Sequence, residues 1–316
     1  ASLGIPNALG EAMAARERAG HALSGWSRIR FETERLRVER LRDNGSLEEA
    51  FQAARQLLRQ CQEAGPDSYP GAGYELAQAY FQLGKLLKLT GAAESAVREF
   101  SVARRQFQTL AETGNGNAGR MAAVVDAEIG DCLAYLQRLQ EAANAYEAAL
   151  TQSGPNAPKG LIATNKMQLG LVRQRQGHYS EAVDLYDSAR RIFEALGEPE
   201  GTARAWKQIA LSHKLSGDIK QALHACQQAL YLYEQQRDRS GVTETLGELG
   251  HLHQIGNELE EAALAYRRLS ELCAQLGDAL GEEAGRNKLA NVLIPVSYTH
   301  LRAHETDSYL VCRLLL

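Results

Sequence analysis

Small and apolar residues recur along this chain at an interval of about 40 residues. The clearest copy, Thr164–Ala189, carries Gly170 in a first amphipathic segment, a turn at Gly177, and Tyr186 in a second amphipathic segment. Apolar and small residues spaced three and four apart predict a helix on each side of the turn, with one apolar face each. We therefore expect a closely packed helical hairpin that is repeated along the chain.

The small residue of the first helix returns in six copies, each preceded by an aliphatic residue. These copies are Gly84, Gly130, Gly170, Ala210, Gly250 and Ala290, separated by 46 residues once and then by 40. In the first five copies a ring or a thiol follows 16 residues later, at Phe100, Tyr146, Tyr186, Cys226 and Tyr266. A small residue at a helix crossing lets the two axes approach, and the large residue fills the space beside the contact.

Alanine also follows the small residue after 12 residues in five copies and after 19 residues in four. This Leu-Gly, Ala, Tyr/Phe, Ala spacing resembles the tetratricopeptide repeat, from Gly45 to about Ile294. The usual repeat has about 34 residues, so the longer unit implies longer helices. The resemblance implies an all-α fold, a right-handed superhelical solenoid of antiparallel helix hairpins. We predict three segments: an N-terminal segment with the first helix of the array at 1–44, the repeat array at 45–294, and a non-native tail at 295–316.

Local signals mark several of the turns between helices. Ser46, with Glu49 three residues later, has the pattern of a capping box, and Asp218 and Asn257 stand where N-caps belong. The Gly/Asn-rich stretch 112–120 supplies the six extra residues of the longer interval. We expect a long flexible turn there.

The repeat pattern stops at Val296. The stretch VSYTHLRAHET resembles the translated end of a sequencing adapter, and the residues after it resemble an index and a primer site. This resemblance implies that the natural protein continues beyond about Ile294 and that the chain is a fragment. His300 and His304, which would share a helical face, are accordingly not expected to bind a metal.

The composition indicates a helix-rich, mildly acidic protein with a net charge of −4. The sequence holds no apolar run of the about 18 residues that a membrane span needs, and its first residues lack a signal-peptide pattern. Five cysteines without a CxxC pair suit reduced thiols, so we predict a cytoplasmic protein without membrane contact. The arginines between positions 21 and 42 alternate with Glu32, Glu34 and Glu39, which favours a solvated helix face over nucleic-acid binding.

The sequence shows no catalytic motif: it lacks a nucleophile elbow, an HExxH pair and a Walker loop. Acidic pairs such as Glu48-Glu49 and Glu260-Glu261 stand at helix starts, where the helix dipole favours negative charge. We therefore expect no catalytic residue, no metal ligand and no cofactor, and we predict that the protein is not an enzyme.

In a curved array of helix hairpins, the first helix of each hairpin lines the concave side. By analogy with tetratricopeptide repeats, the candidates for a peptide groove are Lys85, Lys88, Asp131, Tyr135, Gln174, Arg175, Lys207, Lys214 and His251. An ordinary solvated position is the alternative for each of them. Their charges are mixed, with lysine and arginine in slight excess, which favours an acidic or amphipathic peptide.

We predict a non-enzymatic protein-protein interaction scaffold that binds a peptide or a partner helix in this groove. The alternative is a sensor or autoinhibitory arm of a larger signalling ATPase or caspase-like protease, whose catalytic domain lies outside this chain. A P-loop or a Cys/His dyad beside the array would distinguish the second hypothesis from the first. The pattern leaves the partner and the oligomeric state open.

Overall fold

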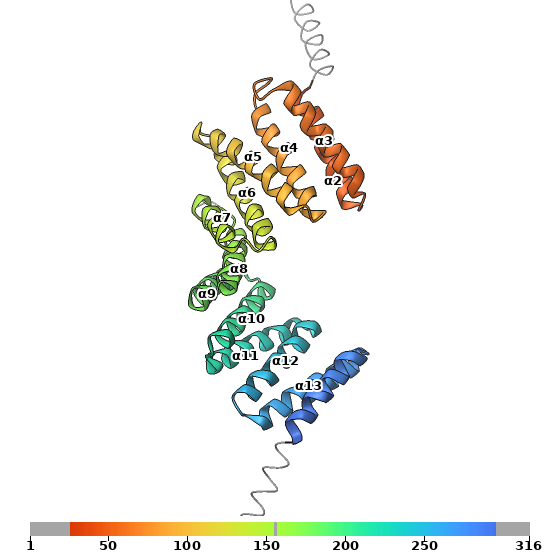
Figure 1. The fold of residues 1–316 in the computed structure, drawn as a ribbon, viewed down its shortest axis with the longest axis vertical. Helices are drawn as coiled ribbons and strands as arrows, with labels where there is room; N and C mark the ends of the chain where they lie inside the picture. Colours follow the sequence, from red (N-terminus) through yellow and green to blue (C-terminus); the bar gives the residue numbers. More distant parts are fainter. Residues whose placement is uncertain (1–25, 155–156, 295–316) are drawn as a thin grey trace, which may run out of the picture. The chain divides into compact units, whose positions relative to one another are not determined.

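The computed structural model describes residues 26–154 and 157–294 of the chain. Within these residues every regular element is a helix (Figure 1), so the predicted all-α fold is confirmed. The helices are α2 (Arg28–Asp43), α3 (Leu47–Ala64), α4 (Ala72–Leu89), α5 (Ala93–Glu112), α6 (Gly116–Tyr135), α7 (Leu139–Gln152), α8 (Lys159–Arg175), α9 (Tyr179–Leu196), α10 (Pro199–Ser216), α11 (Ile219–Gln236), α12 (Arg239–Ile255) and α13 (Leu259–Leu276), and residues 279–294 form one more. The predicted tail at 295–316 lies outside the described residues.

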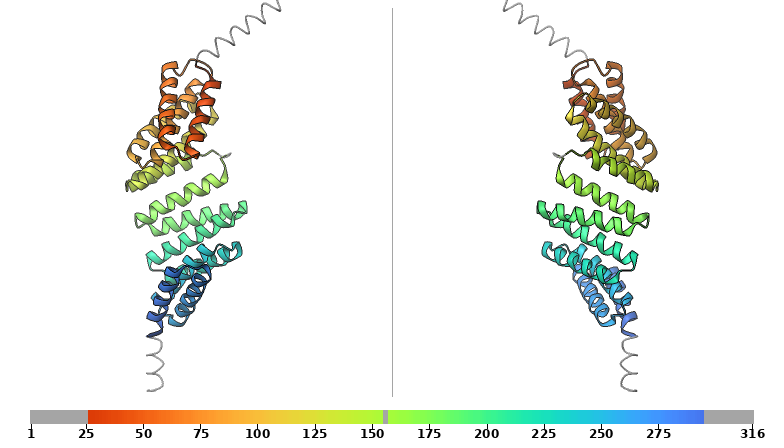
Figure 2. Two further views of the ribbon diagram at one scale, coloured as in Figure 1. Left: turned by 90° about the vertical axis from the view of Figure 1, so that its right-hand side faces the viewer. Right: turned by 90° about the vertical axis from the view of Figure 1, so that its left-hand side faces the viewer.

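The described helices belong to two compact units, which divide between Ala157 and Pro158. In the first unit α2 pairs with α3, α4 with α5 and α6 with α7, while in the second α8 pairs with α9, α10 with α11 and α12 with α13. Each hairpin packs on the next hairpin of its unit through consecutive helices, such as α5 on α6 and α9 on α10. The stacked hairpins of each unit are visible in Figure 2. The predicted helix-hairpin repeat is therefore confirmed.

Four of the predicted glycines share one close contact inside their hairpin. A Cβ added to any of them would lie 2.5 to 2.8 Å from a ring atom of the following helix. The pairs are Gly84–Phe100, Gly130–Tyr146, Gly170–Tyr186 and Gly250–Tyr266. All four rings are buried. The periodic glycines are present because the rings occupy the space that a side chain would need.

Replacing Gly170 with Ala is expected to lower the free energy of unfolding by about 1–3 kcal/mol, because the new methyl group would overpack the crossing. Its Cβ would lie 2.7 Å from the Tyr186 ring. Gly247→Ala in α12 is the matched control, because a Cβ there meets only Leu269 at 3.7 Å, an ordinary contact. Urea denaturation would measure both, and the control should be neutral or more stable, since Ala is the better helix former by up to about 1 kcal/mol. A stabilised Gly170→Ala variant would refute the crossing geometry.

A second row of glycines lies where a second helix meets the next first helix. A Cβ would lie 2.6 Å from the Phe193 ring if added to Gly201, and 2.4 Å from the Tyr233 ring if added to Gly241. Both glycines and both rings are separated by the same interval of 40 residues. These two glycines were not among the predicted crossings, although the periodicity alone could have revealed them.

Of the three predicted N-cap signals, Asp218 is confirmed, Ser46 holds the N-cap position without the predicted capping box, and Asn257 is wrong. The Asp218 side chain accepts a hydrogen bond from the backbone N–H of Gln221, as expected. Ser46 makes no side-chain cap hydrogen bond, so the capping box does not form. Asn257 adopts a left-handed conformation with φ of 59°, and the N-cap of α13 is Glu258. Asn257 therefore terminates α12 instead of starting α13, a role that asparagine fills because it tolerates positive φ.

The long flexible turn expected at 112–120 is wrong for most of its length. The turn spans only Thr113 to Asn115, and α6 begins at Gly116. The side chain of Asn115 accepts hydrogen bonds from the backbone N–H groups of Asn117 and Ala118, both at 3.1 Å. This cap starts a helix inside a Gly/Asn-rich stretch, because it satisfies backbone donors that the first turn leaves without partners. The extra residues mainly lengthen α5 and α6, which have 20 residues each.

Candidate protein-binding face

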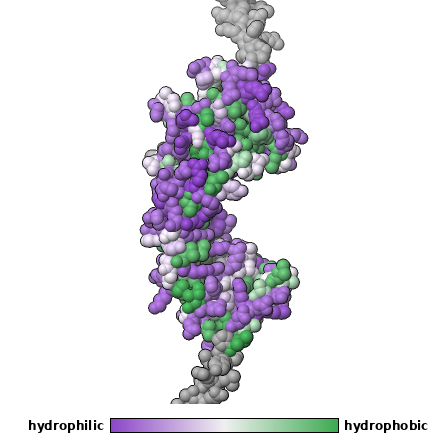
Figure 3. Space-filling view, in the orientation of Figure 1, coloured by the Kyte–Doolittle hydropathy of each residue, from purple (hydrophilic) through white to green (hydrophobic). Residues whose placement is uncertain are grey.

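The predicted groove residues all lie on the first helices of their hairpins, namely α4, α6, α8, α10 and α12. We call the surface that these helices present on the side of the predicted residues the first-helix face, and we describe it in each unit separately. The visible surface of both units is largely hydrophilic, with apolar patches between the polar side chains (Figure 3).

In the first unit, Lys88 joins two first helices. Its Nζ lies 2.7 Å from Glu128 Oε2 and 2.5 Å from Asp131 Oδ2, so α4 is tied to α6. Burial disfavours the charge on Lys88, but hydrogen bonds and attraction from the two carboxylates outweigh it and raise the pKa of the ammonium group. Asp131 also accepts a hydrogen bond from the Tyr146 hydroxyl, which connects this ion pair to a buried crossing. Lys88 and Asp131 therefore have a structural role.

In the second unit, α10 makes similar contacts with both neighbouring first helices. Lys214 Nζ lies 2.8 Å from Glu248 Oε2 of α12, and Lys207 pairs with Glu244 of the same helix. On the other side, the amide of Gln174 on α8 donates to Ser212 Oγ at 2.8 Å. Gln174 is buried, at 6% exposure. Its side chain therefore holds two first helices together and offers little surface to a ligand.

These pairs change the electrostatic picture of the face. Each of three predicted lysines, Lys88, Lys207 and Lys214, has a carboxylate partner on the neighbouring first helix. Their positive charge is compensated locally, which weakens the reason for expecting an acidic partner.

The other predicted residues lie in more open positions. Tyr135 is 70% exposed at the end of α6, and His251 and Arg175 are exposed. The Lys85 ammonium lies 5.7 Å from the centroid of the Phe81 ring on the same helix. Of the predicted residues, Tyr135, His251 and Arg175 are thus exposed, and Lys85 is half-buried.

Two apolar residues of the face were not among the predicted groove residues. Leu171 and Leu211 directly follow the small residues Gly170 and Ala210, the position that Asp131 and His251 occupy in other hairpins. Leu171 is 38% exposed, and Leu211 lines a pocket. A comparison of the residues that directly follow the small residue in each hairpin would have identified both leucines. The face of the second unit is therefore apolar at its centre and charged beside it.

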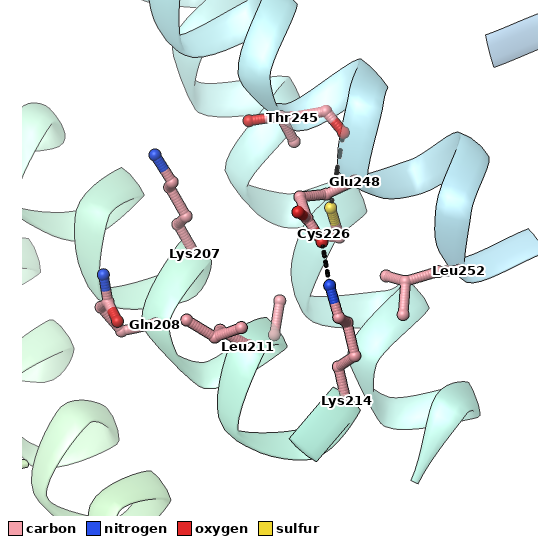
Figure 4. Close-up of a pocket in the computed structure, with 9 residues that line it drawn as sticks. Lys207, Gln208, Leu211, Lys214, Cys226, Thr245, Glu248 and Leu252 are labelled. Atoms are coloured by element: carbon pink, nitrogen blue, oxygen red, sulfur yellow. Dashed lines mark hydrogen bonds and ion pairs between the residues drawn. The ribbon is translucent and has the colours of Figure 1, made fainter. Parts of the chain in front are cut away.

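A pocket of about 80 Å³ lies between α10, α11 and α12 (Figure 4). Its walls include Ala210, Leu211, Cys226, Thr245 and Leu252. Two predicted groove residues, Lys207 and Lys214, also line it. Both lysines lie on α10, a first helix, and the pocket beside them was not predicted.

Cys226 in this pocket is not suited to nucleophilic chemistry. Its Sγ lies 3.7 Å from the backbone oxygen of Thr245, to which the thiol donates. Burial, assisted by the carboxylate of Glu248, raises the pKa of the Cys226 thiol to about 12. The thiolate required for attack or metal binding is therefore scarce at neutral pH. Within residues 26–154 and 157–294, no group of three or more His, Cys, Asp or Glu side chains is arranged to hold a metal ion.

Residues 161–235 match the family model described as tetratricopeptide repeat. This stretch carries tetratricopeptide repeats. These repeats are a protein-interaction motif, and the matched residues include α10 and most of α11, two of the three helices around the pocket. None of the helices within residues 26–154 and 157–294 combines the length and the apolar character that crossing a membrane requires.

A protein of Arabidopsis thaliana and a solved structure are similar to this chain. Protein kinesin light chain-related 3 of Arabidopsis thaliana is 28% identical over 209 residues, which are 64% of this chain and 30% of that protein. The chain therefore spans less than a third of this relative's length. Among solved structures, BtubC (BKLC) from P. vanneervenii has a TM-score of 0.60 at 18% identity and covers 73% of this chain and 92% of its own.

A second solved structure bears on the sensor-arm hypothesis. A signal transduction ATPase with numerous domains and a tetratricopeptide repeat sensor, from Pyrococcus horikoshii, has a TM-score of 0.56 at 14% identity. It covers 87% of this chain and 43% of its own. At this identity the likeness concerns the fold alone, so the sensor-arm hypothesis stays a prediction.

Proposed function

We propose that the tetratricopeptide array is a non-enzymatic scaffold that binds a peptide segment or helix of a partner protein on its first-helix face. The observation that carries the proposal is the mixed character of this face in the second unit. Leu171 and Leu211 supply apolar contact area, while the ion pairs of Lys207 and Lys214 hold α10 against α12. A rigid face of this kind suits an amphipathic segment, because apolar anchors provide affinity and the polar rim provides orientation.

The proposal is tested by selecting 12-residue peptides from a displayed random library on the full chain and measuring their affinity by fluorescence anisotropy. Leu171→Glu and Leu211→Glu should each weaken the selected peptides at least 10-fold, because each places a charge in the apolar centre. Leu264→Glu on α13 is the matched control, since Leu264 is 62% exposed on a second helix. A library that yields no binder, or binders equally sensitive to all three variants, would contradict this function.

The lysines need a different design, because reversing one of them alone also breaks an ion pair. Lys214→Glu would face Glu248, whereas the double variant Lys214→Glu with Glu248→Lys keeps a pair across α10 and α12. We expect the exchanged pair to preserve peptide affinity within about 3-fold. The single Lys214→Glu variant should weaken the peptides more than that, by distorting the face. Equal loss in both variants would mean that Lys214 contacts the peptide directly, a result that the compensated charge does not lead us to expect.

A further inference from the structure

The α10–α11 hairpin has a different pair of residues at its helix crossing from the pair found in the neighbouring hairpins. Other crossings combine a glycine with a ring, as in Gly170–Tyr186 and Gly250–Tyr266. At the equivalent positions this hairpin has Ala210 and Cys226. The added methyl group of Ala210 is much smaller than the ring that is absent from position 226. The pocket of about 80 Å³ lies at this crossing and is lined by both residues.

The pocket is lined by residues of the first-helix face. Lys207, Gln208, Leu211 and Lys214 of α10 line one side, and Thr245, Glu248 and Leu252 of α12 line the other (Figure 4). The charges at this rim are already compensated, since Lys214 pairs with Glu248 and Lys207 with Glu244. The inner walls are Ala210, Leu211, Leu252 and Cys226. Such a site suits an uncharged, apolar group.

The size of the pocket narrows the choice of ligand. A cavity of roughly 150 Å³ is known to hold a benzene ring, so about 80 Å³ matches a branched aliphatic side chain better than an aromatic ring.

We propose that the α10–α12 pocket receives a leucine, or another branched aliphatic side chain, of the partner segment. This inference rests on the proposed function and adds the identity of an anchor residue. The anchor side chain takes part of the volume that a ring occupies in the neighbouring hairpins.

The test uses N-acetyl-leucine N-methylamide as a single-residue probe, with the alanine and tryptophan analogues for comparison. Methyl NMR of the full chain should show saturable shifts at Leu211 and Leu252 with the leucine probe, which should bind at least 5-fold tighter than either analogue. Intermolecular nuclear Overhauser contacts between the isobutyl group of the probe and these two leucines are also expected. Equal binding of the alanine probe, or absence of these contacts, would overturn the proposal.

A variant that restores the glycine-and-ring pair of the other hairpins gives the decisive control. Ala210→Gly combined with Cys226→Tyr should fill the pocket with the missing ring, and should abolish the leucine-probe shifts while thermal unfolding stays cooperative. Cys226→Ala leaves the pocket open and should retain binding. Undiminished binding to the filled variant would refute the pocket assignment. Should the filled variant not fold, the nuclear Overhauser contacts in the original chain decide.

Two further measurements separate this inference from the proposed function and from another occupant. Selected 12-residue peptides that lack an aliphatic anchor and bind the filled variant with unchanged affinity would refute the inference and leave the function standing. Failure to select any peptide, together with saturable leucine-probe binding, would refute the function alone. Removal of residues 295–316 should leave probe affinity unchanged, whereas a 10-fold gain would show that the chain's own tail occupies the pocket and would overturn a partner-derived anchor.

Discussion

Truncating Tyr186 to Ala is expected to lower the free energy of unfolding by about 3–5 kcal/mol, the range for loss of a large buried aromatic side chain. Tyr186 is 0% exposed and its ring packs directly on Gly170, so the truncation would leave a cavity at the centre of the α8–α9 hairpin. The α helices on both sides cannot collapse fully into it, because neighbouring hairpins hold them. Urea denaturation followed by circular dichroism would measure the loss. A change below about 0.5 kcal/mol, which is typical of surface substitutions, would refute the packing.

Replacing tyrosine with phenylalanine tests the contribution of the hydroxyl group apart from that of the ring. The Tyr186 hydroxyl is buried without a hydrogen-bond partner, whereas the Tyr146 hydroxyl donates to Asp131. Tyr186→Phe should therefore leave stability unchanged or raise it slightly, because an unpaired buried polar group costs free energy. Tyr146→Phe should lower stability by about 1.5–3 kcal/mol, the range for a hydrogen bond to a charged group. Equal effects of the two substitutions would contradict the different environments of these equivalent rings.

Replacing Arg104 with Met is expected to lower the free energy of unfolding by about 3 kcal/mol at neutral pH. Asp126 is fully buried, its Oδ1 lies 3.2 Å from Arg104 Nη1, and Gln152 donates to Oδ2 at 2.9 Å. Without Arg104, a buried carboxylate would lose its charge partner, a change that costs about 3–5 kcal/mol for fully buried pairs. We expect the lower end, because the Arg104 side chain is 37% exposed. Adding Asp126→Asn should recover most of the loss, since no charge then remains unpaired.

The pH dependence of this effect has a definite sign. Burial raises the pKa of the Asp126 carboxyl above its ordinary value of 3.8, and Arg104 opposes that rise. Without Arg104 the folded-state pKa should rise further, so the folded state binds more protons than the unfolded state over a wider window. The stability contribution of protonated Asp126 is therefore present below about pH 4 and lost as the pH rises through the folded-state pKa. The deficit of Arg104→Met, compared with the double variant by urea denaturation, should grow with pH, and a deficit independent of pH would contradict the mechanism.

The sequence was informative wherever partners lie close together along the chain. Gly170 and Tyr186 are 16 residues apart and sit on two helices joined by one short turn. Their contact must therefore recur at a constant offset in every hairpin, and it appears as periodicity. The prediction of a flexible turn at 112–120 was wrong. The composition of this stretch indicated flexibility, but one side chain, Asn115, caps a helix within it. A single hydrogen-bonding residue outweighed the average preference of the stretch.

The candidate site was only partly predictable. The analogy with tetratricopeptide repeats placed all nine groove candidates on first helices, but it could not tell an open side chain such as Tyr135 from a buried one such as Gln174. Gln174 meets Ser212 at a separation of 38 residues, while Lys214 meets Glu248 at a separation of 34. These separations differ because each polar pair depends on side-chain length and direction in addition to the helix register.

By itself, then, the sequence determined the helix type, the hairpin repeat and the small-residue crossings, because steric exclusion between neighbouring helices imposes those residues at regular offsets. Only the tertiary structure decided which charges neutralise one another across α10 and α12, and that the pair Ala210 and Cys226 leaves a pocket. Both outcomes depend on the sum of several side-chain volumes and on pairings between different hairpins, and neither quantity is contained in the residue pattern of one repeat.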